Sequence, residues 1–252
     1  MNGAPSVAAL RQMKRDGRKI VAAVVYDYQM AQIADHAGVD IVSAGDSVGV
    51  TMWGHTDESE ITLDQILLVC RAVRRGVVRA LVSCDVPLAP LHGGTQQALD
   101  AATRLVREGG ADLVKVDVDA SSVDAVGAIA GAGLSVWAQF SGVATAAAPT
   151  TDRYVLVARE LERAGAALID FRHSGPIAGP LVVASVDLPV IGGLGGGPWL
   201  DGRVRSVAAA LGYLASSCDD GNDRYANIAA TARGAIAALR DDVREGRRLR
   251  GE

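Results

Sequence analysis

Residues 39–55, VDIVSAGDSVGVTMWGH, place an apolar run directly before an aspartate that stands between a glycine and a serine. The first six residues are mostly apolar, which is typical of a strand buried on both faces in a parallel sheet. Gly45 permits a sharp turn at the end of this strand, so Asp46 is expected at its carboxyl edge. Ligands of α/β folds bind at that edge. Asp46 is therefore a candidate ligand-binding residue, or alternatively the cap of the next helix.

The same unit, an apolar run followed by a polar loop and an amphipathic helix, recurs along the chain. Glycine-containing joints at 37–40, 109–112 and 164–167 are expected to end helices that lead straight into strands. The predicted strands are Ile20 to Tyr26, Asp40 to Ala44, Ala80 to Cys84, Leu113 to Asp117, Ser135 to Phe140, Ala167 to Phe171 and Val190 to Gly193. The predicted helices lie near Ser6 to Asp16, Tyr28 to Ala37, Leu63 to Arg75, Thr95 to Glu108, Ser122 to Ala132, Asp152 to Ala164 and Ile177 to Ser185.

This alternation predicts an α/β fold with parallel strands and right-handed crossovers. An eighth strand is expected in Arg203 to Ala208, although that run could equally begin a helix. A closed (β/α)₈ TIM barrel fits best, and an open doubly wound sheet is the second choice. The 252 residues suit one barrel. We predict a single domain, 1–252, that ends in a helix at about 222–250.

Composition excludes several classes of protein. A net charge of −4 with scattered cations argues against a nucleic-acid partner. The long uncharged stretch from Ala125 to Thr151 is broken by glycines and a proline, which argues against a membrane span. The three cysteines are odd in number and far apart, as expected for reduced thiols in the cytoplasm.

Three predicted strands end in carboxylates, at Asp46, Asp85 and Asp117. In a barrel such residues converge at one end, and hard divalent cations prefer oxygen ligands, so the three predict a Mg²⁺ or Mn²⁺ site. Lys115 lies two residues before Asp117, hence on the same face, where its ammonium group can meet a substrate carboxylate. The alternative is that the aspartates only cap helices.

Several motifs in fixed order resemble the ketopantoate hydroxymethyltransferase family, from Lys19 to about Gly212. They are Val-Tyr-Asp-Tyr at 25–28, Ala-Gly-Asp-Ser-Val-Gly at 44–49, Gly-His at 54–55, Ile-Thr-Leu-Asp at 61–64, Ala-Val-Arg-Arg-Gly at 72–76, Asp-Val-Pro at 85–87, Gly-Ala-Asp-Leu-Val-Lys-Val-Asp at 110–117 and Leu-Pro-Val-Ile-Gly at 188–192. The resemblance implies a (β/α)₈ barrel of the phosphoenolpyruvate mutase and isocitrate lyase superfamily.

The resemblance also implies an activity in pantothenate biosynthesis. With Mg²⁺ or another divalent cation, the family joins a small-molecule 2-oxo acid, 3-methyl-2-oxobutanoate, to a one-carbon unit from 5,10-methylenetetrahydrofolate, and it assembles as a homo-oligomer, a decamer. Asp46 and Asp85 match its metal ligands, and Asp117 stands where it has glutamate. Ser47 and Lys115 match residues that touch the carboxylate of the 2-oxo acid.

The chain departs from the family pattern at the proton-transfer half of the site. Arg172 stands where the family keeps its catalytic glutamate, and a guanidinium cannot act as a general base. Gln139 replaces a histidine, and the family's substrate loop has no counterpart between Ser141 and Arg153. Asp170 is expected to face the barrel interior with Arg172, and a pair between them would depress the pKa of the aspartate.

Three hypotheses about function follow. The first is a metal-dependent hydroxymethyltransferase or aldolase that forms a 2-oxo acid enolate, with Asp170, Arg172 and Lys115 as catalytic residues and Ser47, Lys115, Tyr26, Gln139 and Arg172 as substrate-binding residues. Tyr26 and His173 are other candidates for the base. The second is a diverged aldolase or lyase of specialised metabolism that uses no folate. In it Arg172 binds a second acidic group, unless it only pairs with Asp170. The third is a non-catalytic paralogue with a binding or assembly role.

Overall fold

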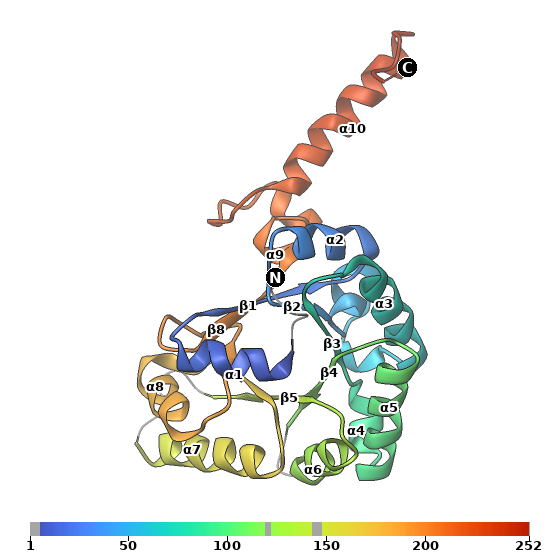
Figure 1. Ribbon diagram of the computed structural model, residues 1–252. Helices are drawn as coiled ribbons and strands as arrows, with labels where there is room; N and C mark the ends of the chain where they lie inside the picture. The colour runs from blue at the N-terminus through green and yellow to red at the C-terminus, as the bar shows by residue number, and fades with distance from the viewer. Residues whose placement is uncertain (1–5, 119–121, 143–147, 252) are drawn as a thin grey trace. The chain divides into compact units, whose positions relative to one another are not determined.

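A computed structural model describes residues 6–118, 122–142 and 148–251, without the side chains of 148 and 149. Eight strands follow one another around a closed barrel in sequence order (Figure 1). Every neighbouring pair from β1–β2 to β7–β8 is parallel. The strands are β1 (Ile20–Val25), β2 (Ile41–Ala44), β3 (Leu81–Asp85), β4 (Leu113–Asp117), β5 (Val136–Ser141), β6 (Leu168–Arg172), β7 (Val190–Gly192) and β8 (Gly202–Ser206). The predicted (β/α)₈ barrel is confirmed, and the open sheet is excluded.

Helices connect the successive strands from β1 to β7 and lie outside the ring that the strands form, whereas α1 precedes β1 and lies across one end of the ring (Figure 1). Gly38, Gly110 and Gly165 have φ angles of 82°, 78° and 95°, so the three predicted glycine joints are confirmed. The helices of the barrel are α1 (Val7–Arg15), α2 (Tyr28–His36), α3 (Leu63–Gly76), α4 (Leu88–His92), α5 (Thr95–Arg107), α6 (Val123–Gly131), α7 (Ala148–Arg163) and α8 (Gly175–Ser185). Helix α4, the π-helix η1 (Gly49–Trp53) and the 3₁₀-helix η2 (Glu58–Glu60) are absent from the sequence-based prediction.

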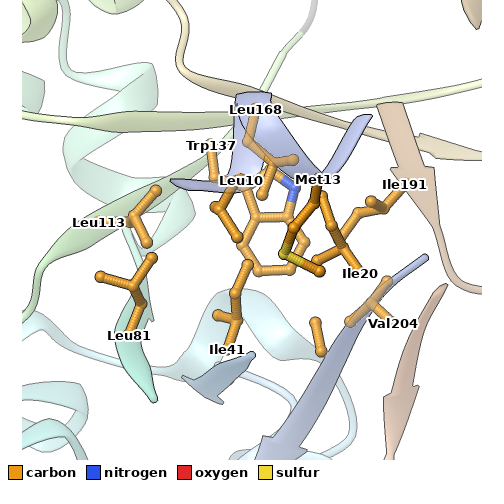
Figure 2. Close-up of a cluster of buried hydrophobic side chains, with 11 residues drawn as sticks. Leu10, Met13, Ile20, Ile41, Leu81, Leu113, Trp137, Leu168, Ile191 and Val204 are labelled. Carbon is orange, nitrogen blue, oxygen red and sulfur yellow. The ribbon is translucent and has the colours of Figure 1, made fainter. Parts of the chain in front are cut away.

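The amino-terminal end of the barrel is filled by apolar side chains. Strands β1 to β8 each contribute an interior residue near their start, and Leu10 and Met13 of α1 pack onto these residues (Figure 2). Trp137 of β5 is fully buried in the middle of the cluster. Because this end is closed by α1, the interior can receive a ligand only at the carboxyl ends of the strands. The cluster is Leu10, Met13, Ile20, Ala22, Ile41, Leu81, Leu113, Trp137, Leu168, Ile191 and Val204.

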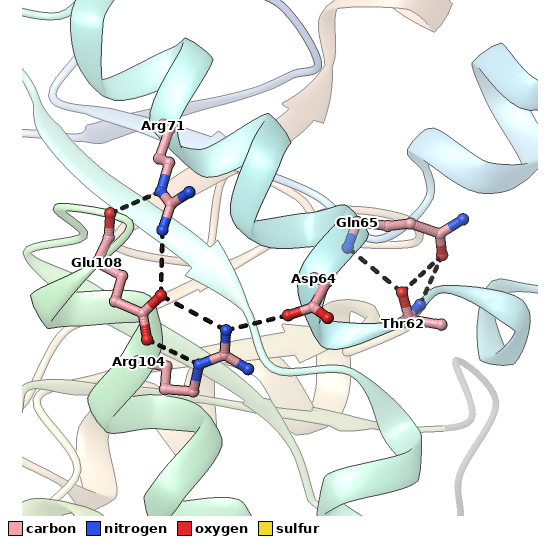
Figure 3. A network of polar contacts seen from close by, with 6 residues as sticks. All are labelled: Thr62, Asp64, Gln65, Arg71, Arg104 and Glu108. Carbon is pink, nitrogen blue, oxygen red and sulfur yellow. Dashed lines mark hydrogen bonds and ion pairs between the residues drawn. The ribbon is translucent and has the colours of Figure 1, made fainter.

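Ion pairs join two neighbouring helices on the outside of the barrel (Figure 3). Arg104 of α5 contacts Asp64 of α3 at 3.0 Å and Glu108 at 2.8 Å, and Arg71 of α3 contacts Glu108 at 3.1 Å. Thr62 begins α3 with a capping box that it completes with Gln65. These exposed contacts join α3 to α5, which pack against β3 and β4 respectively.

Contacts divide the chain into two compact units, residues 1–205 and 206–252. The second holds α9 (Val207–Ala210), η3 (Ala215–Cys218) and α10 (Ile228–Arg244). Both readings of Arg203 to Ala208 are partly right, because β8 ends there and α9 begins there. The helix predicted at about 222–250 is shorter at both ends. Asn227 caps the first turn of α10 by accepting from the N–H of Ala230, and Gly246, with φ 64°, follows its last turn.

The prediction of a single domain stays a prediction. None of the helices in the described ranges is long and apolar enough to cross a membrane.

Candidate active site

A layer of polar side chains lies above the apolar cluster, at the carboxyl ends of the strands. Side chains alternate along a strand, so residues two and four positions after an interior residue also face the interior. Leu113, Trp137 and Leu168 are interior residues of β4, β5 and β6. The polar residues that follow them on the same face are Lys115 and Asp117 of β4, Gln139 of β5, and Asp170 and Arg172 of β6.

Lys115 and Asp170 form an ion pair across the interior, with 3.3 Å between Nζ and Oδ2. The ammonium group also lies 5.2 Å from the ring centre of Trp137. Burial alone would lower the pKa of Lys115, but the carboxylates of Asp85, Asp170, Asp117 and Asp46 outweigh burial and raise it. Lys115 is therefore a buried cation surrounded by carboxylates.

This pairing corrects the prediction that Asp170 pairs with Arg172. Lys115 is the ion-pair partner of Asp170, and the pKa of Asp170 is raised, not depressed. Burial raises this pKa by more than the charges of Lys115 and Arg172 lower it. Burial dominates because Asp170 lies deeper in the barrel than Arg172 and is only 1% exposed.

Asp46 and Asp85 lie together at the ends of β2 and β3. The backbone N–H of Asp46 donates to Oδ2 of Asp85 at 3.3 Å. Burial, followed by the charges of Asp85 and Glu58, raises the pKa of Asp46 to about 9. The buried Oδ1 of Asp85 has no hydrogen-bond partner in the described chain. Two carboxyl groups this close cannot both stay charged without a proton or a cation between them.

Asp46 depends on Gly45 for its position. A Cβ atom on Gly45 would lie 2.6 Å from Cγ1 of Val24 and 3.2 Å from Oγ of Ser47. No side chain fits there unless the Val24 side chain or the turn shifts. The glycine that precedes the aspartate in the sequence is therefore required by close packing between β1 and the turn after β2.

Tyr26 and Ser47 meet beside this pair. The Tyr26 hydroxyl lies 3.0 Å from Oγ of Ser47 and donates to Oγ1 of Thr51 on the π-helix η1 at 3.4 Å. The structure thus brings together two predicted substrate-binding residues, from the ends of β1 and β2. Thr51, which sequence reasoning missed, joins them because η1 turns back toward β1.

Gln139 is hydrogen-bonded to Asp117, which stands opposite it in the register of β4 and β5. The amide Nε2 donates to Oδ1 of Asp117, so the glutamine holds this carboxylate. Nowhere in 6–118, 122–142 and 148–251 do three His, Cys, Asp or Glu side chains gather as ligands around one point. The three-aspartate ligand set stays a prediction, of which Asp46 and Asp85 form the close pair.

Arg172 ends β6, opposite Ser141 of β5, and is half-buried. In the part of the chain that the structure describes, its guanidinium makes no hydrogen bond or ion pair. The strand ends at Arg172, and His173, a candidate for the base, is exposed with φ 53°. Its N–H donates to the carbonyl of Leu194 at 2.6 Å.

Glu58 of η2 is an exposed acidic residue whose charge interacts with the residues of the site, and the sequence-based prediction missed it. Burial raises its pKa, the charge of Arg172 opposes this most strongly, and Asp85 and Asp117 raise it further. Glu60 pins the loop by accepting hydrogen bonds from Thr56 and from the N–H of Asp57. The sequence signal was the capping box at Asp57, which fixes η2 next to the site.

The chemistry of this donor set fits a divalent cation. Asp46 and Asp85 supply hard oxygen atoms, and the buried Oδ1 of Asp85, which accepts no hydrogen bond from a described residue, is placed to bind a cation. Burial is the main cause of the raised pKa of Asp46, and the negative charges of Asp85 and Glu58 raise it further. A dication would offset these negative charges, whereas Lys115 offsets them only in part.

Known proteins resemble this chain along almost its whole length. A sequence profile described as ketopantoate hydroxymethyltransferase matches residues 5–247. The 3-methyl-2-oxobutanoate hydroxymethyltransferase of Acetivibrio thermocellus is 31% identical, over 98% of this chain and 91% of its own. The protein of the same name from Gloeobacter violaceus is 33% identical, over 95% of this chain and 96% of its own.

Solved structures with low sequence identity share the fold. A crystal structure of 2,3-dimethylmalate lyase, a member of the PEP mutase/isocitrate lyase superfamily, has a TM-score of 0.62 and 18% identity over 95% of this chain and 86% of its own. Phosphonopyruvate hydrolase in complex with oxalate and Mg²⁺ has a TM-score of 0.63 and 15% identity, over 96% of this chain and 88% of its own. The barrel is therefore of the kind found in that superfamily.

Proposed function

The chain belongs to the ketopantoate hydroxymethyltransferase family, and from that premise we propose a metal-dependent transferase that forms the enolate of a 2-oxo acid and joins it to a one-carbon unit. The observation that carries the proposal is the Asp46–Asp85 pair beside the buried ammonium group of Lys115. The named relatives are all transferases, so the lyase and the non-catalytic hypotheses are not favoured.

Asp46 and Asp85 would hold Mg²⁺ or another divalent cation, with Asp117 as a third ligand. When bound, such a cation withdraws electrons from the 2-oxo group and makes the proton at C3 more acidic. Oδ1 of Asp117 accepts a hydrogen bond from Gln139, so Oδ2 of Asp117 would be the atom that binds a cation or water.

Lys115 and Ser47 would orient the carboxylate of the 2-oxo acid. An ammonium group has three N–H donors, and the contact with Asp170 occupies one of them. The Ser47 hydroxyl is held by Tyr26 and so presents its oxygen in a fixed direction. The substrate carboxylate would then lie between β2 and β4, next to the Asp46–Asp85 pair.

Asp170 is the candidate for the group that takes the proton from C3. Its Oδ2 pairs with Lys115, while its buried Oδ1 has no hydrogen-bond partner among the described residues. Burial raises the pKa of Asp170, which makes the carboxylate a stronger base than an exposed aspartate. Arg172 beside it would steady the negative charge of the enolate.

We propose 5,10-methylenetetrahydrofolate as the one-carbon donor, a homo-oligomer as the working form, and the cytoplasm as the compartment. The three cysteines are free thiols in the structure, as a reducing compartment requires. Light scattering of the purified chain tests the assembly, because a decamer has ten times the mass of one chain.

The enolate step is tested by deuterium exchange at C3 of 3-methyl-2-oxobutanoate in D₂O, followed by proton NMR with Mg²⁺ present. We expect the C3 proton signal to disappear faster with the enzyme than without it. Asp170→Asn should slow the exchange by about 100- to 10,000-fold, the usual contribution of a general base. Loss of exchange after EDTA treatment, and its return with Mg²⁺, is expected as well.

Metal binding is measured separately, by calorimetric titration of the EDTA-treated protein with Mg²⁺. Asp46→Asn and Asp85→Asn should each abolish the binding heat and the exchange. Asp100→Asn is the matched control, because Asp100 lies on α5 and its carboxylate accepts a hydrogen bond from Gln96 in an exposed pair. No exchange with any small 2-oxo acid, in a protein that is folded and binds Mg²⁺, would refute the enolate chemistry.

A further inference from the structure

Arg172 is a cation of the site that forms no ion pair with any described residue. Its guanidinium makes no hydrogen bond or ion pair in the described ranges, and the nearest carboxylate on its own strand, Asp170, is paired with Lys115. The backbone of Arg172 is fixed, because its carbonyl accepts from the N–H of Gly142 at 2.8 Å. The side chain therefore starts from a rigid strand end, and its charged group is available to a ligand.

The position of Arg172 places that charge at the entrance of the barrel. Leu168 faces the interior cluster, so Asp170 and Arg172 face the interior as well, each about 7 Å further along the strand than the one before. Asp170 is 1% exposed, whereas Arg172 is half-buried. Arg172 thus belongs to the interior layer nearest the open end, above the layer that holds Asp170.

Neighbouring charges show that Arg172 shares the site with the acidic residues. Its charge lowers the pKa of Asp170, and it is the strongest influence opposing the burial that raises the pKa of Glu58. Neither carboxylate makes an ion pair with it among the described residues. A guanidinium in this position presents a planar fork of N–H donors that matches a carboxylate or a phosphonate with two parallel hydrogen bonds.

We propose that Arg172 binds a second anionic group of the substrate, so that this enzyme takes a dianionic 2-oxo acid. The inference rests on the proposed function, because it assumes that Lys115, Ser47 and the Asp46–Asp85 pair take the 2-oxo acid end. Arg172 comes from β6, whereas these residues come from β2, β3 and β4. A substrate with acidic groups at both ends would be held from two sides of the barrel.

The test compares three acids that differ only at the far end. The probes are 2-oxopentanoate, which ends in a methyl group, 2-oxoglutarate, which carries a carboxylate there, and 2-oxo-4-phosphonobutanoate, which carries a phosphonate. Full-length protein with Mg²⁺ is used, and kcat/KM for deuterium exchange at C3 and Kd from calorimetry are measured for each acid. We expect at least one dianion to be preferred over 2-oxopentanoate by about 10- to 100-fold, as charge-assisted hydrogen bonds provide. The better dianion identifies the second group.

Variants connect the preference to Arg172. Arg172→Met should remove the preference, so that kcat/KM for the preferred dianion falls by about 10- to 100-fold more than kcat/KM for 2-oxopentanoate. Arg172→Lys should keep part of the preference, because an ammonium retains the charge without the fork. Arg205→Met is the matched control. Arg205 is exposed on β8 and follows Val204, which faces the interior cluster. Circular dichroism verifies that each variant is folded.

Two outcomes would overturn the inference. One is a wild-type protein that does not prefer either dianion. The other is a preference that persists in Arg172→Met, which would mean that Arg172 only balances the carboxylates. Failure of the proposed function looks different: none of the acids would exchange at C3, yet calorimetry would still report whether dianions bind more tightly and whether Arg172 is the cause.

Discussion

Lys115 and Asp170 meet across β5, although they belong to β4 and β6, which are not neighbours in the barrel. Their charged atoms lie 3.3 Å apart, and their side chains are 11% and 2% exposed. The pair is possible because the interior side chains of a closed barrel point at one another across its axis. It places a positive charge in the centre of a site that otherwise collects carboxylates.

Lys115→Met should destabilise the protein by about 3–5 kcal/mol at neutral pH, because the substitution leaves Asp170 buried without its partner. Protonation of Asp170 would relieve this penalty, so the loss should be smaller at pH 4.5 than at pH 7.5. Urea unfolding at the two pH values measures both effects. The double variant Lys115→Met/Asp170→Leu should regain most of the stability, since no charge is then buried. Equal losses in the single and double variants would contradict this account.

The parts of the fold that depend on local sequence could be predicted. Apolar runs marked the strands, and glycines such as Gly38 and Gly165 marked the helix ends, because both signals act within a few residues. The contacts that arrange the site could not. Whether Asp170 pairs with Lys115 or with Arg172 depends on the tilt and register of strands that lie far apart in sequence, and alternation within one strand does not determine these.

The acidic half of the site shows the same limit. Asp46 and Asp85 were assigned to one site from their positions at strand ends, and the structure brings them together. Glu58 was missed, because its approach to the site depends on how η1 and η2 fold back over the barrel. A five-residue π-helix gives no periodic apolar pattern that would reveal it.

Lys14 should be one of the most sensitive residues for stability, although it is far from the site. Its ammonium group donates to the carbonyls of Val183, Val186 and Leu188 at 2.8, 2.8 and 3.0 Å, and it lies 3.3 Å from Asp201. It thereby satisfies carbonyls at the end of α8 that no helical N–H reaches. Lys14→Met should lower the free energy of unfolding by about 2–4 kcal/mol in urea titrations.

Arg11→Met is the control for Lys14, because Arg11 lies exposed on the same helix. Its effect should stay within about 0.5 kcal/mol. If both variants unfold at the same urea concentration, the carbonyl contacts of Lys14 contribute nothing to stability.

Asp35 should make stability depend on acid pH. Its buried carboxylate accepts from the N–H groups of Val78, Arg79 and Ala80 at 3.2, 2.9 and 2.8 Å. Burial acts to raise the pKa of Asp35, but these donors and the charge of Arg79 outweigh it and lower the pKa. A lowered pKa stabilises the fold above the unfolded value of about 3.9, and this contribution is lost as pH falls through the folded value.

Asp35→Asn should therefore cost about 1–3 kcal/mol at pH 7. The cost should shrink as the pH falls below about 4, because the carboxyl group of the unfolded wild type takes up a proton first and that of the folded protein only at lower pH. Urea unfolding of both proteins from pH 3 to pH 7 measures the difference. For Asp100→Asn, at an exposed position of α5, the free energy of unfolding should change with pH in the same way as for the wild type. A gap between Asp35→Asn and the wild type that stays constant over this range would rule out the pKa as its cause.

Gly45→Ala tests whether the turn after β2 positions Asp46. The new Cβ would lie 2.6 Å from Cγ1 of Val24, closer than packed atoms approach, so either the Val24 side chain or the turn must shift. Overpacking of this kind costs about 1–3 kcal/mol. A shift of the turn should also break the contact of the Asp46 N–H with Asp85. The rate of C3 exchange should then fall by more than the loss of folded protein accounts for. Gly127→Ala in α6 is the matched control, because the new Cβ would meet nothing within 4 Å. This substitution should stabilise the helix by about 0.5–1 kcal/mol. Full exchange activity in Gly45→Ala would show that the turn tolerates a side chain and that its glycine does not position Asp46.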